Sequence, residues 1–384
     1  MAKKNKKLKK VFMFVNVDWF FFSHRLAIAK AARPNQFRMS VYTDLTNSEK
    51  SNQKREFNLY QSPISRSSKN KILLILEFLK VFLLILKKKP DLIHAVTIKP
   101  IILLGIISRL TKTPFIGAIS GLGPVFSAQT FFSNIRLKIV LLIYRFIFKP
   151  KYSTIICQNS HDKKIFTDLK IATVSKITIS PGSGVDLDRF KPIESHSQKR
   201  NVLMASRILS DKGVYEYCAA AKSLNSGEGN IEFKLAGPID ELSPSAISLK
   251  ELESLCENSG VEYLGNRNDL NTLLPLASIF VLPSYYAEGM PKVLLEAASC
   301  GIPVITTNHP GCRDAIINNK TGILIESRNS KSIELAILKL LNDTDLMIKM
   351  GKAGRKLAEK NYDERKVIDL HYHLYRYLTK KAFN

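Results

Sequence analysis

Short apolar runs alternate with longer amphipathic stretches along most of the 384-residue chain. The runs lack the polar alternation of a half-exposed strand, which is typical of strands buried on both faces of a parallel sheet. Between them, apolar residues recur at the spacing of a helix. Representative runs are VFMFVNV (11–17), DLIHAV (91–96), NVLMAS (201–206) and IFVLP (279–283). The alternation predicts an α/β protein with parallel sheets.

A polar stretch at residues 191–199 interrupts this pattern, and it contains Pro192, Glu194 and two serines. A chain of this length has room for two domains with substantial cores. We therefore expect a first domain over residues 1–192 and a second over 193–362. A helix is expected over residues 363–384.

The most distinctive stretch is SYYAEGMPKVLLEAASCGIPVITTN, residues 284–308. It predicts a loop carrying Glu288 and Gly289, a helix that begins near Pro291, and a further strand. Helix N–H groups at the carboxyl edge of a sheet bind anionic ligands. Glu288 and Glu296 could accept hydrogen bonds from sugar and ribose hydroxyls. The alternative is one acid near the helix start and one exposed helix acid.

Two cations follow the run at 201–206, namely Arg207 at its end and Lys212 five residues later. At the carboxyl edge of a parallel sheet such a pair is suited to clamp a diphosphate, and the fork of Arg fits phosphate oxygens well. The alternative is a pair of surface charges where the next helix begins.

The segment EGMPKVLLEAASCGIPVITT resembles the E-x7-E segment of the retaining glycosyltransferases of family GT4, which have the GT-B fold. The segment GVDLDRF (184–190) and the spacing of Arg207 and Lys212 resemble the same family. The resemblance implies two Rossmann-like domains facing a cleft. The first would bind the acceptor and face the membrane, the second would bind the nucleotide-sugar, and the last helix would cross back to the first.

The resemblance also implies roles for single residues. Glu288 would contact the donor sugar, Arg207 and Lys212 would neutralise the leaving diphosphate, and Glu296 would bind the ribose. Other donor-binding candidates are the helix start, with Gly289, Met290, Pro291 and Lys292, and Arg267 on the side of the base.

Candidates for the acceptor side lie in the first domain. The stretch WFFFSHRL (19–26) resembles a WFF-x-SHRL variant in relatives that build bacterial surface polysaccharides, and it places Ser23 and His24 at an expected helix start. A capping role for Ser23 is the alternative. After the strand at 114–120, Gly121 and Gly123 would permit a close backbone approach to a ligand. Relatives often carry His near Ser120, so no catalytic role is transferred to that residue.

The net charge of +25 lies mainly in the first 150 residues, which hold 27 Lys and Arg against 6 Asp and Glu. The helices expected at 71–89 and 131–151 combine lysines and arginines with apolar side chains. They are either packed helices with snorkelling cations or helices lying at an anionic membrane surface. Five scattered cysteines without a C-x-x-C pair indicate a reducing cytoplasm. We expect a peripheral protein on the inner face of the cytoplasmic membrane.

No metal or other cofactor is expected, because the candidate ligands have simpler explanations. Asp343 and Asp345 lie between two helical patterns and suit capping, and His371 and His373 lie on different faces of one helix. The predicted function is transfer of a hexose or N-acetylhexosamine from a UDP-linked sugar to a lipid-linked or cell-envelope glycan. The alternatives are a UDP-sugar epimerase of the same fold, or a non-enzymatic protein that binds anionic lipid or nucleic acid. On the predicted function, no nucleic acid is expected as a partner.

Overall fold

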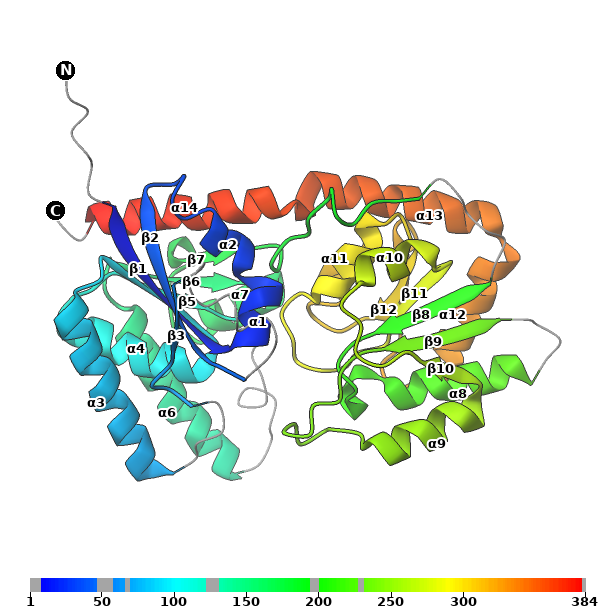
Figure 1. The fold of residues 1–384 in the computed structure, drawn as a ribbon, viewed down its shortest axis with the longest axis horizontal. Helices are drawn as coiled ribbons and strands as arrows, with labels where there is room; N and C mark the ends of the chain where they lie inside the picture. Colours follow the sequence, from blue (N-terminus) through cyan, green and yellow to red (C-terminus); the bar gives the residue numbers. More distant parts are fainter. Residues whose placement is uncertain are drawn as a thin grey trace, which may run out of the picture. The chain divides into compact units, whose positions relative to one another are not determined.

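The computed structural model describes residues 8–46, 58–65, 70–121, 131–193, 200–226 and 231–381 (Figure 1). The chain forms two compact units, Met1–Ser183 with Arg365–Asn384, and Gly184–Glu364. Each unit contains one sheet whose paired strands are all parallel. The predicted α/β class is confirmed. The change of unit falls at residues 183/184, whereas the polar stretch had placed it at 192/193.

The first unit contains a seven-stranded sheet in the order β3-β2-β1-β4-β5-β6-β7. Its strands are β1 (Lys9–Val17), β2 (Phe37–Asp44), β3 (Leu59–Gln61), β4 (Leu92–Val96), β5 (Phe115–Ala118), β6 (Ser153–Cys157) and β7 (Ile177–Ile179). Its helices are α1 (Asp18–His24), α2 (Leu26–Lys30), α3 (Lys71–Lys88), α4 (Ile98–Thr111), α6 (Phe131–Phe148), α7 (Ser160–Asp168) and most of α14 (Glu364–Lys381).

Both faces of this sheet are buried, as the continuous apolar runs predict. Along β1, Val11, Met13 and Val15 pack in one core cluster with residues of α14, whereas Phe12 and Phe14 pack in a second cluster with residues of α3, α4 and α6. The side-chain alternation of a strand therefore feeds two cores.

The C-terminal helix α14 is fixed to the first unit by hydrogen bonds as well as by packing. The Tyr372 hydroxyl donates to the carbonyl of Ile28 at 2.6 Å, and the Tyr375 hydroxyl lies 2.8 Å from Nδ1 of His94. All three side chains named here from α14 and β4 are buried. Arg365–Asn384 consequently belongs to the same compact unit as the first half of the chain.

Helix α3 is buried on one side and exposed on the other, so the alternative of a fully packed helix does not describe it. Val81 and Ile85 face the core, and Glu77 is buried on the same side, where its Oε2 lies 2.8 Å from Nζ of Lys99. The rest of the helix presents a broad apolar surface. Its exposed residues are Ile72, Leu73, Ile75, Leu76, Leu79, Leu83 and Leu86.

The second unit contains a six-stranded sheet in the order β10-β9-β8-β11-β12-β13. Its strands are β8 (Asn201–Ala205), β9 (Glu232–Ala236), β10 (Val261–Tyr263), β11 (Ile279–Leu282), β12 (Val304–Thr307) and β13 (Gly322–Ile325). Its helices are α8 (Val214–Asn225), α9 (Leu249–Ser259), α10 (Leu270–Leu273), α11 (Lys292–Ser299), α12 (Ser330–Asn342) and α13 (Thr344–Leu357).

The strand order of this second sheet reverses between β8 and β11. The connections that follow these two neighbouring strands leave in opposite directions, which opens a crevice at their carboxyl ends. In doubly wound sheets, ligands bind at such a switch point. Arg207 and Lys212 follow β8, and Glu288 follows β11, so the topology brings these predicted residues to one place.

Candidate active site

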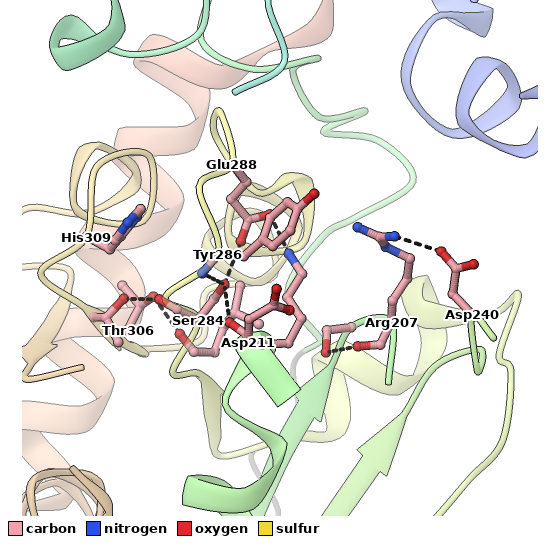
Figure 2. Close-up of polar contacts among 12 residues, drawn as sticks. Arg207, Asp211, Asp240, Ser284, Tyr286, Glu288, Thr306 and His309 are labelled. Carbon is pink, nitrogen blue, oxygen red and sulfur yellow. Dashed lines mark hydrogen bonds and ion pairs between the residues drawn. The ribbon is translucent and has the colours of Figure 1, made fainter. Parts of the chain in front are cut away.

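An ion pair joins the two segments that leave the switch point (Figure 2). Nζ of Lys212 lies 2.6 Å from Oε2 of Glu288, and the two side chains are 8% and 15% exposed. Lys212 ends a short 3-10 turn after β8, and the left-handed Gly213 follows it at φ +82°. A Cβ at Gly213 would lie 2.5 Å from the carbonyl oxygen of Pro283, so glycine allows the two segments to approach closely.

The Glu288 carboxylate is also held by its own loop. Its Oε1 accepts a hydrogen bond from the hydroxyl of Ser284 at 2.8 Å, and Ser284 is fully buried directly after Pro283. The carbonyl of Ser284 accepts a hydrogen bond from the Thr307 hydroxyl at the end of β12. The Glu288 side chain is therefore oriented by both the cation and the sheet edge.

A second loop supports the backbone at Glu288 and Gly289. A Cβ at Gly311, which has φ +83°, would lie 1.6 Å from the carbonyl oxygen of Gly289 and 2.8 Å from that of Glu288. The loop that contains Pro310 and Gly311 can pass this close only because no side chain intervenes. In the view of Figure 2, His309 of the same loop lies on the side of Glu288 away from Arg207.

Arg207 forms the second cationic position of the site. Its Nη1 lies 2.8 Å from Oδ2 of Asp240, a residue that follows β9. The Tyr286 ring lies near both cations, with its centroid 5.9 Å from Cζ of Arg207 and 5.1 Å from Nζ of Lys212. An aromatic face at this distance attracts cations. The ring therefore favours keeping both charges at the crevice.

A further carboxylate, Asp211, lies between these groups in the sequence and in the site (Figure 2). Burial raises the pKa of Asp211, and the neighbouring Lys212 and Arg207 only partly oppose this effect. Its Oδ1 is buried without a hydrogen-bond partner in the part of the chain that the structure describes. The hydroxyl of a ligand could donate a hydrogen bond to this atom.

The predicted helix is α11, which begins at Lys292 with Pro291 as its N-cap residue. Met290, Pro291 and Lys292 lie at this start, as expected from the sequence, and Met290 is buried. Glu296 is 7% exposed, so it is not an exposed helix acid. Burial raises the pKa of Glu296, and Nζ of Lys292, 3.6 Å from its Oε1, opposes that rise.

Arg267 differs from the other donor-side candidates because it contacts its own neighbour. Its guanidinium donates two hydrogen bonds to the carboxylate of Asp269, at 2.9 and 2.6 Å, and both side chains are largely exposed. This contact lies in the loop after β10. A role of Arg267 toward the base stays a prediction.

The acceptor-side candidates are arranged differently from the expectation. Helix α1 runs from Asp18 to His24, so Ser23 and His24 lie at its end, and the helix expected after them is α2, which begins at Leu26. The Ser23 hydroxyl donates to the Trp19 carbonyl at 2.8 Å and lies 2.6 Å from Nδ1 of His24. It therefore does not cap the start of a helix.

Asp18 is the first residue of α1. Its carboxylate accepts from the backbone N–H of Trp19 and from both the N–H and the hydroxyl of Thr46, at 2.7 to 3.0 Å.

Ser120 and Gly121 follow β5, and Oγ of Ser120 is buried without a hydrogen-bond partner among the described residues. Gly123 lies outside the described residues.

Sequence reasoning missed Ser284, Tyr286, Asp211 and Asp240, which complete the polar contacts around the predicted residues. Asp211 precedes the predicted Lys212 and Ser284 begins the loop that carries Glu288, so their positions in the connections after β8 and β11 could have indicated them. Asp240 lies in the connection after β9, where no predicted residue is near in the sequence.

The described residues contain no group of three or more His, Cys, Asp or Glu side chains that could hold a metal ion. In the described ranges, no helix is long and apolar enough to cross a membrane. The Asp343 side chain accepts a hydrogen bond from the N–H of Leu346, which confirms its predicted capping role.

Comparisons with known proteins match nearly the whole chain. Residues 187–357 match the family described as glycosyl transferases group 1, and residues 10–159 match the family described as glycosyl transferase 4-like. A relative from Campylobacter jejuni is 31% identical over 289 residues, 72% of this chain and 74% of its own. That protein is N,N'-diacetylbacillosaminyl-diphospho-undecaprenol alpha-1,3-N-acetylgalactosaminyltransferase.

Two further proteins extend the comparison. The Escherichia coli UDP-Gal:alpha-D-GlcNAc-diphosphoundecaprenol alpha-1,3-galactosyltransferase is 29% identical over 297 residues, 73% of this chain and 74% of its own. HepE of Anabaena, solved with UDP and glucose, superposes with a TM-score of 0.77 at 16% identity, over 95% of this chain and 98% of its own. The predicted GT-B fold is confirmed.

Proposed function

Because the chain belongs to the glycosyl transferases group 1 family and is a glycosyltransferase of the GT4 type, we propose that it moves a hexose or N-acetylhexosamine from a UDP-linked sugar to a lipid-linked glycan of the bacterial surface. The observation that carries this proposal is the Lys212–Glu288 pair beside Arg207 at the switch point. The curated relatives named above act on sugars linked to diphospho-undecaprenol, and one of them is named for UDP-Gal.

The two cations suit the leaving group of this reaction. The bond between the anomeric carbon of the sugar and the diphosphate breaks, and negative charge grows on the departing phosphate oxygens. Arg207, Lys212 and the N–H groups at the start of α11 would stabilise that charge, which is the type of interaction that lowers a barrier most effectively. Since these groups supply the positive charge, we propose that the enzyme needs no metal ion.

We further propose that transfer retains the anomeric configuration. The acceptor hydroxyl would attack from the face that the diphosphate leaves, form the new bond to the anomeric carbon, and give its proton to the departing phosphate oxygen. Glu288 then has a binding role rather than a nucleophilic role. When Lys212 binds the diphosphate instead of Glu288, Oε2 of Glu288 can accept a hydrogen bond from a hydroxyl of the donor sugar. Ser284 would still hold Oε1 in place.

Glu296 would bind the nucleotide ribose. Its carboxylate is buried and its contact with Lys292, at 3.6 Å, is long for a hydrogen bond. Two ribose hydroxyls would give this carboxylate the short donors that a buried charge requires. The same contacts explain why a charged residue is kept in a helix whose other central side chains are buried and small or apolar.

The surface of α3 supports the acceptor and location that we propose. Leu79 and Leu83 are 47% and 63% exposed, and Lys80 and the lysines at 87–89 are exposed beside this apolar surface. Exposed aliphatic side chains with flanking lysines fit the interface of an anionic bilayer, because acyl chains cover the former and headgroups attract the latter. We propose that this surface docks the enzyme peripherally on the inner face of the cytoplasmic membrane.

The donor proposal is tested by a thermal-shift panel of UDP, GDP, ADP, CMP and dTDP on the wild type and on Glu296→Ala. A ligand that binds only the folded state raises the melting temperature by mass action. We expect a shift with UDP that is lost in Glu296→Ala. Shifts with another diphosphate alone would refute the UDP proposal, and chelation with EDTA should leave the UDP shift unchanged.

The transfer step is tested with UDP-galactose or UDP-N-acetylgalactosamine and an undecaprenyl-diphosphate-linked N-acetylhexosamine. We expect product formation, and NMR of the product should show the same anomeric configuration as in the donor. Glu288→Ala should abolish it without loss of the folded state. Release of an epimerised UDP-sugar without acceptor would instead support the epimerase alternative.

Membrane docking is tested by sedimentation with vesicles that contain phosphatidylglycerol. Leu83→Asp is expected to weaken binding at least tenfold, because it removes an exposed aliphatic group whose burial in the bilayer is worth about 1 kcal/mol and adds a charge that the anionic lipid repels. Leu335→Asp on α12, at a leucine of similar exposure (56%), is the matched control. Equal loss in both variants would contradict a specific docking surface on α3.

A further inference from the structure

Asp240 lies against the guanidinium of Arg207, although it follows a different strand. Their side chains are 11% and 27% exposed, so the carboxylate is the more buried partner. In Figure 2 the guanidinium lies between Asp240 and the ring of Tyr286. A pair with one largely buried partner holds its geometry more firmly than two exposed side chains do.

The backbone keeps the two partners in register. Residues 237–247 form a strap that runs beside the segment after β8. The N–H of Ile208 donates to the carbonyl of Pro238 at 2.9 Å, and the N–H of Ser210 donates to the carbonyl of Ser245 at 2.8 Å. The first bond is made by the residue after Arg207, and Asp240 lies between the two acceptor residues in the strap. The ion pair is therefore set by main-chain pairing between the strap and the site segment.

The strap leaves β9 through an unusually close contact. Gly237 has φ +148°, and a Cβ there would lie 1.7 Å from the carbonyl oxygen of Ser206, the residue before Arg207. Only glycine fits this position. The chain thus brings the strap directly onto the backbone that carries Arg207.

We propose that Asp240 is a positioning residue for the transfer reaction. It holds Arg207 so that the edge of the guanidinium that Asp240 does not bind faces the diphosphate of the donor. Because Arg presents its donors in a rigid fork, fixing one edge fixes the direction of the other. This inference rests on the diphosphate role proposed for Arg207, and it adds a residue outside the predicted set.

The effect on catalysis follows from when the contact matters most. Charge on the diphosphate grows as the sugar leaves, so a correctly aimed Arg207 stabilises the transition state more than the bound donor. Loss of orientation should therefore lower kcat more than it raises the donor KM. A residue needed only for folding would lower the amount of active protein without this split.

The test compares Asp240→Ala, Asp240→Asn, Arg207→Ala and the double variant Arg207→Ala/Asp240→Ala. UDP affinity is measured by calorimetry, and kcat and KM by the transfer assay. Asp240→Ala is expected to weaken UDP binding at least fivefold and to lower kcat at least tenfold. Asp240→Asn keeps a hydrogen-bond acceptor and should stay within threefold of wild type in both.

The double variant decides whether Asp240 acts through Arg207. If it does, Arg207→Ala/Asp240→Ala binds UDP no more weakly than Arg207→Ala alone. Effects that multiply would overturn the proposal, and so would an Asp240→Asn variant as impaired as Asp240→Ala. Glu334→Ala is the matched control: its carboxylate is 12% exposed and pairs with Lys331 at 2.5 Å on α12, and its removal should change neither constant.

The same experiment separates this proposal from the proposed donor. If the wild type binds GDP or ADP and not UDP, the donor proposal fails, and the cycle is measured with the nucleotide that binds. If no nucleoside diphosphate binds the wild type, both proposals are overturned.

Discussion

The Lys212–Glu288 ion pair is expected to contribute to the stability of the second unit as well as to activity. Replacing Lys212 with Met keeps most of the side-chain volume but leaves the Glu288 carboxylate without its cation at 2.6 Å. Both partners are well below one-third exposed, so water compensates the loss poorly. We expect Lys212→Met to destabilise the second unit strongly.

The magnitude follows from the geometry of the pair. Removing one partner of a buried ion pair costs about 3–5 kcal/mol. Ser284 still donates to Oε1 of Glu288 at 2.8 Å, so we place Lys212→Met at the lower end, about 3 kcal/mol. The double variant Lys212→Met/Glu288→Gln leaves no buried charge and should cost only about 1 kcal/mol.

Urea unfolding followed by far-UV circular dichroism measures these differences, and the fluorescence of Trp19 follows the first unit separately because it is the only tryptophan. Lys331→Met is the control, since Lys331 is 65% exposed and pairs with Glu334 at 2.5 Å. Its cost should be below about 1 kcal/mol. A Lys212→Met variant as mild as this control, or a double variant as costly as both single changes together, would refute the reasoning.

Three further predictions concern other parts of the two units. Gly311→Ala should lower the free energy of unfolding by more than roughly 2 kcal/mol, because its Cβ would lie 1.6 Å from the carbonyl oxygen of Gly289. Gly265→Ala is the control: nothing lies within 4 Å of its Cβ, so it should cost only about 1 kcal/mol. Urea unfolding measures both. Burial raises the pKa of Glu296 above its usual 4.5, so Glu296→Gln should be more stable than wild type at pH 7 in thermal melts, with the difference vanishing below pH 4.5. Burial lowers the pKa of His371 from 6.5 to about 4, so wild-type stability should fall from pH 6.5 toward 4, and less steeply in His371→Gln. A wild-type profile that is flat over this range would contradict the last prediction.

The sequence predicts the sheets and the meeting of Arg207, Lys212 and Glu288 well, because both depend on short sequence patterns and on the order of the strands. Continuous apolar runs identify most strands, and residues directly after parallel strands must gather at one sheet edge. Arg207, Lys212 and Glu288 therefore meet as expected. Asp343, predicted to cap from its place before a helical pattern, likewise accepts from the N–H of Leu346 three residues on.

Features that depend on distant partners were predicted less well. The short helix α1 was not predicted, and its first residue, Asp18, is satisfied by Thr46, which lies 28 residues further along the chain. An apolar helix with few charges, such as α3, has the same pattern whether it is buried or faces a membrane. Only the packed structure shows which of its sides meets the core.

Lys212 and Glu288 contact each other, so a change at either residue affects both the stability of the fold and the site. Lys212 and Glu288 stabilise the fold through their contact, and on the proposed function the donor diphosphate would replace Glu288 as the partner of Lys212. Loss of activity in Glu288→Ala alone could therefore come from the missing sugar contact or from a buried, unpaired Lys212. Glu288→Gln and the Lys212→Met/Glu288→Gln double variant separate the two causes, because the double variant recovers stability without recovering either ligand contact. A stable double variant that does not bind UDP would assign Lys212 to the diphosphate site. A stable Glu288→Gln variant that binds UDP but transfers no sugar would assign Glu288 to the sugar site.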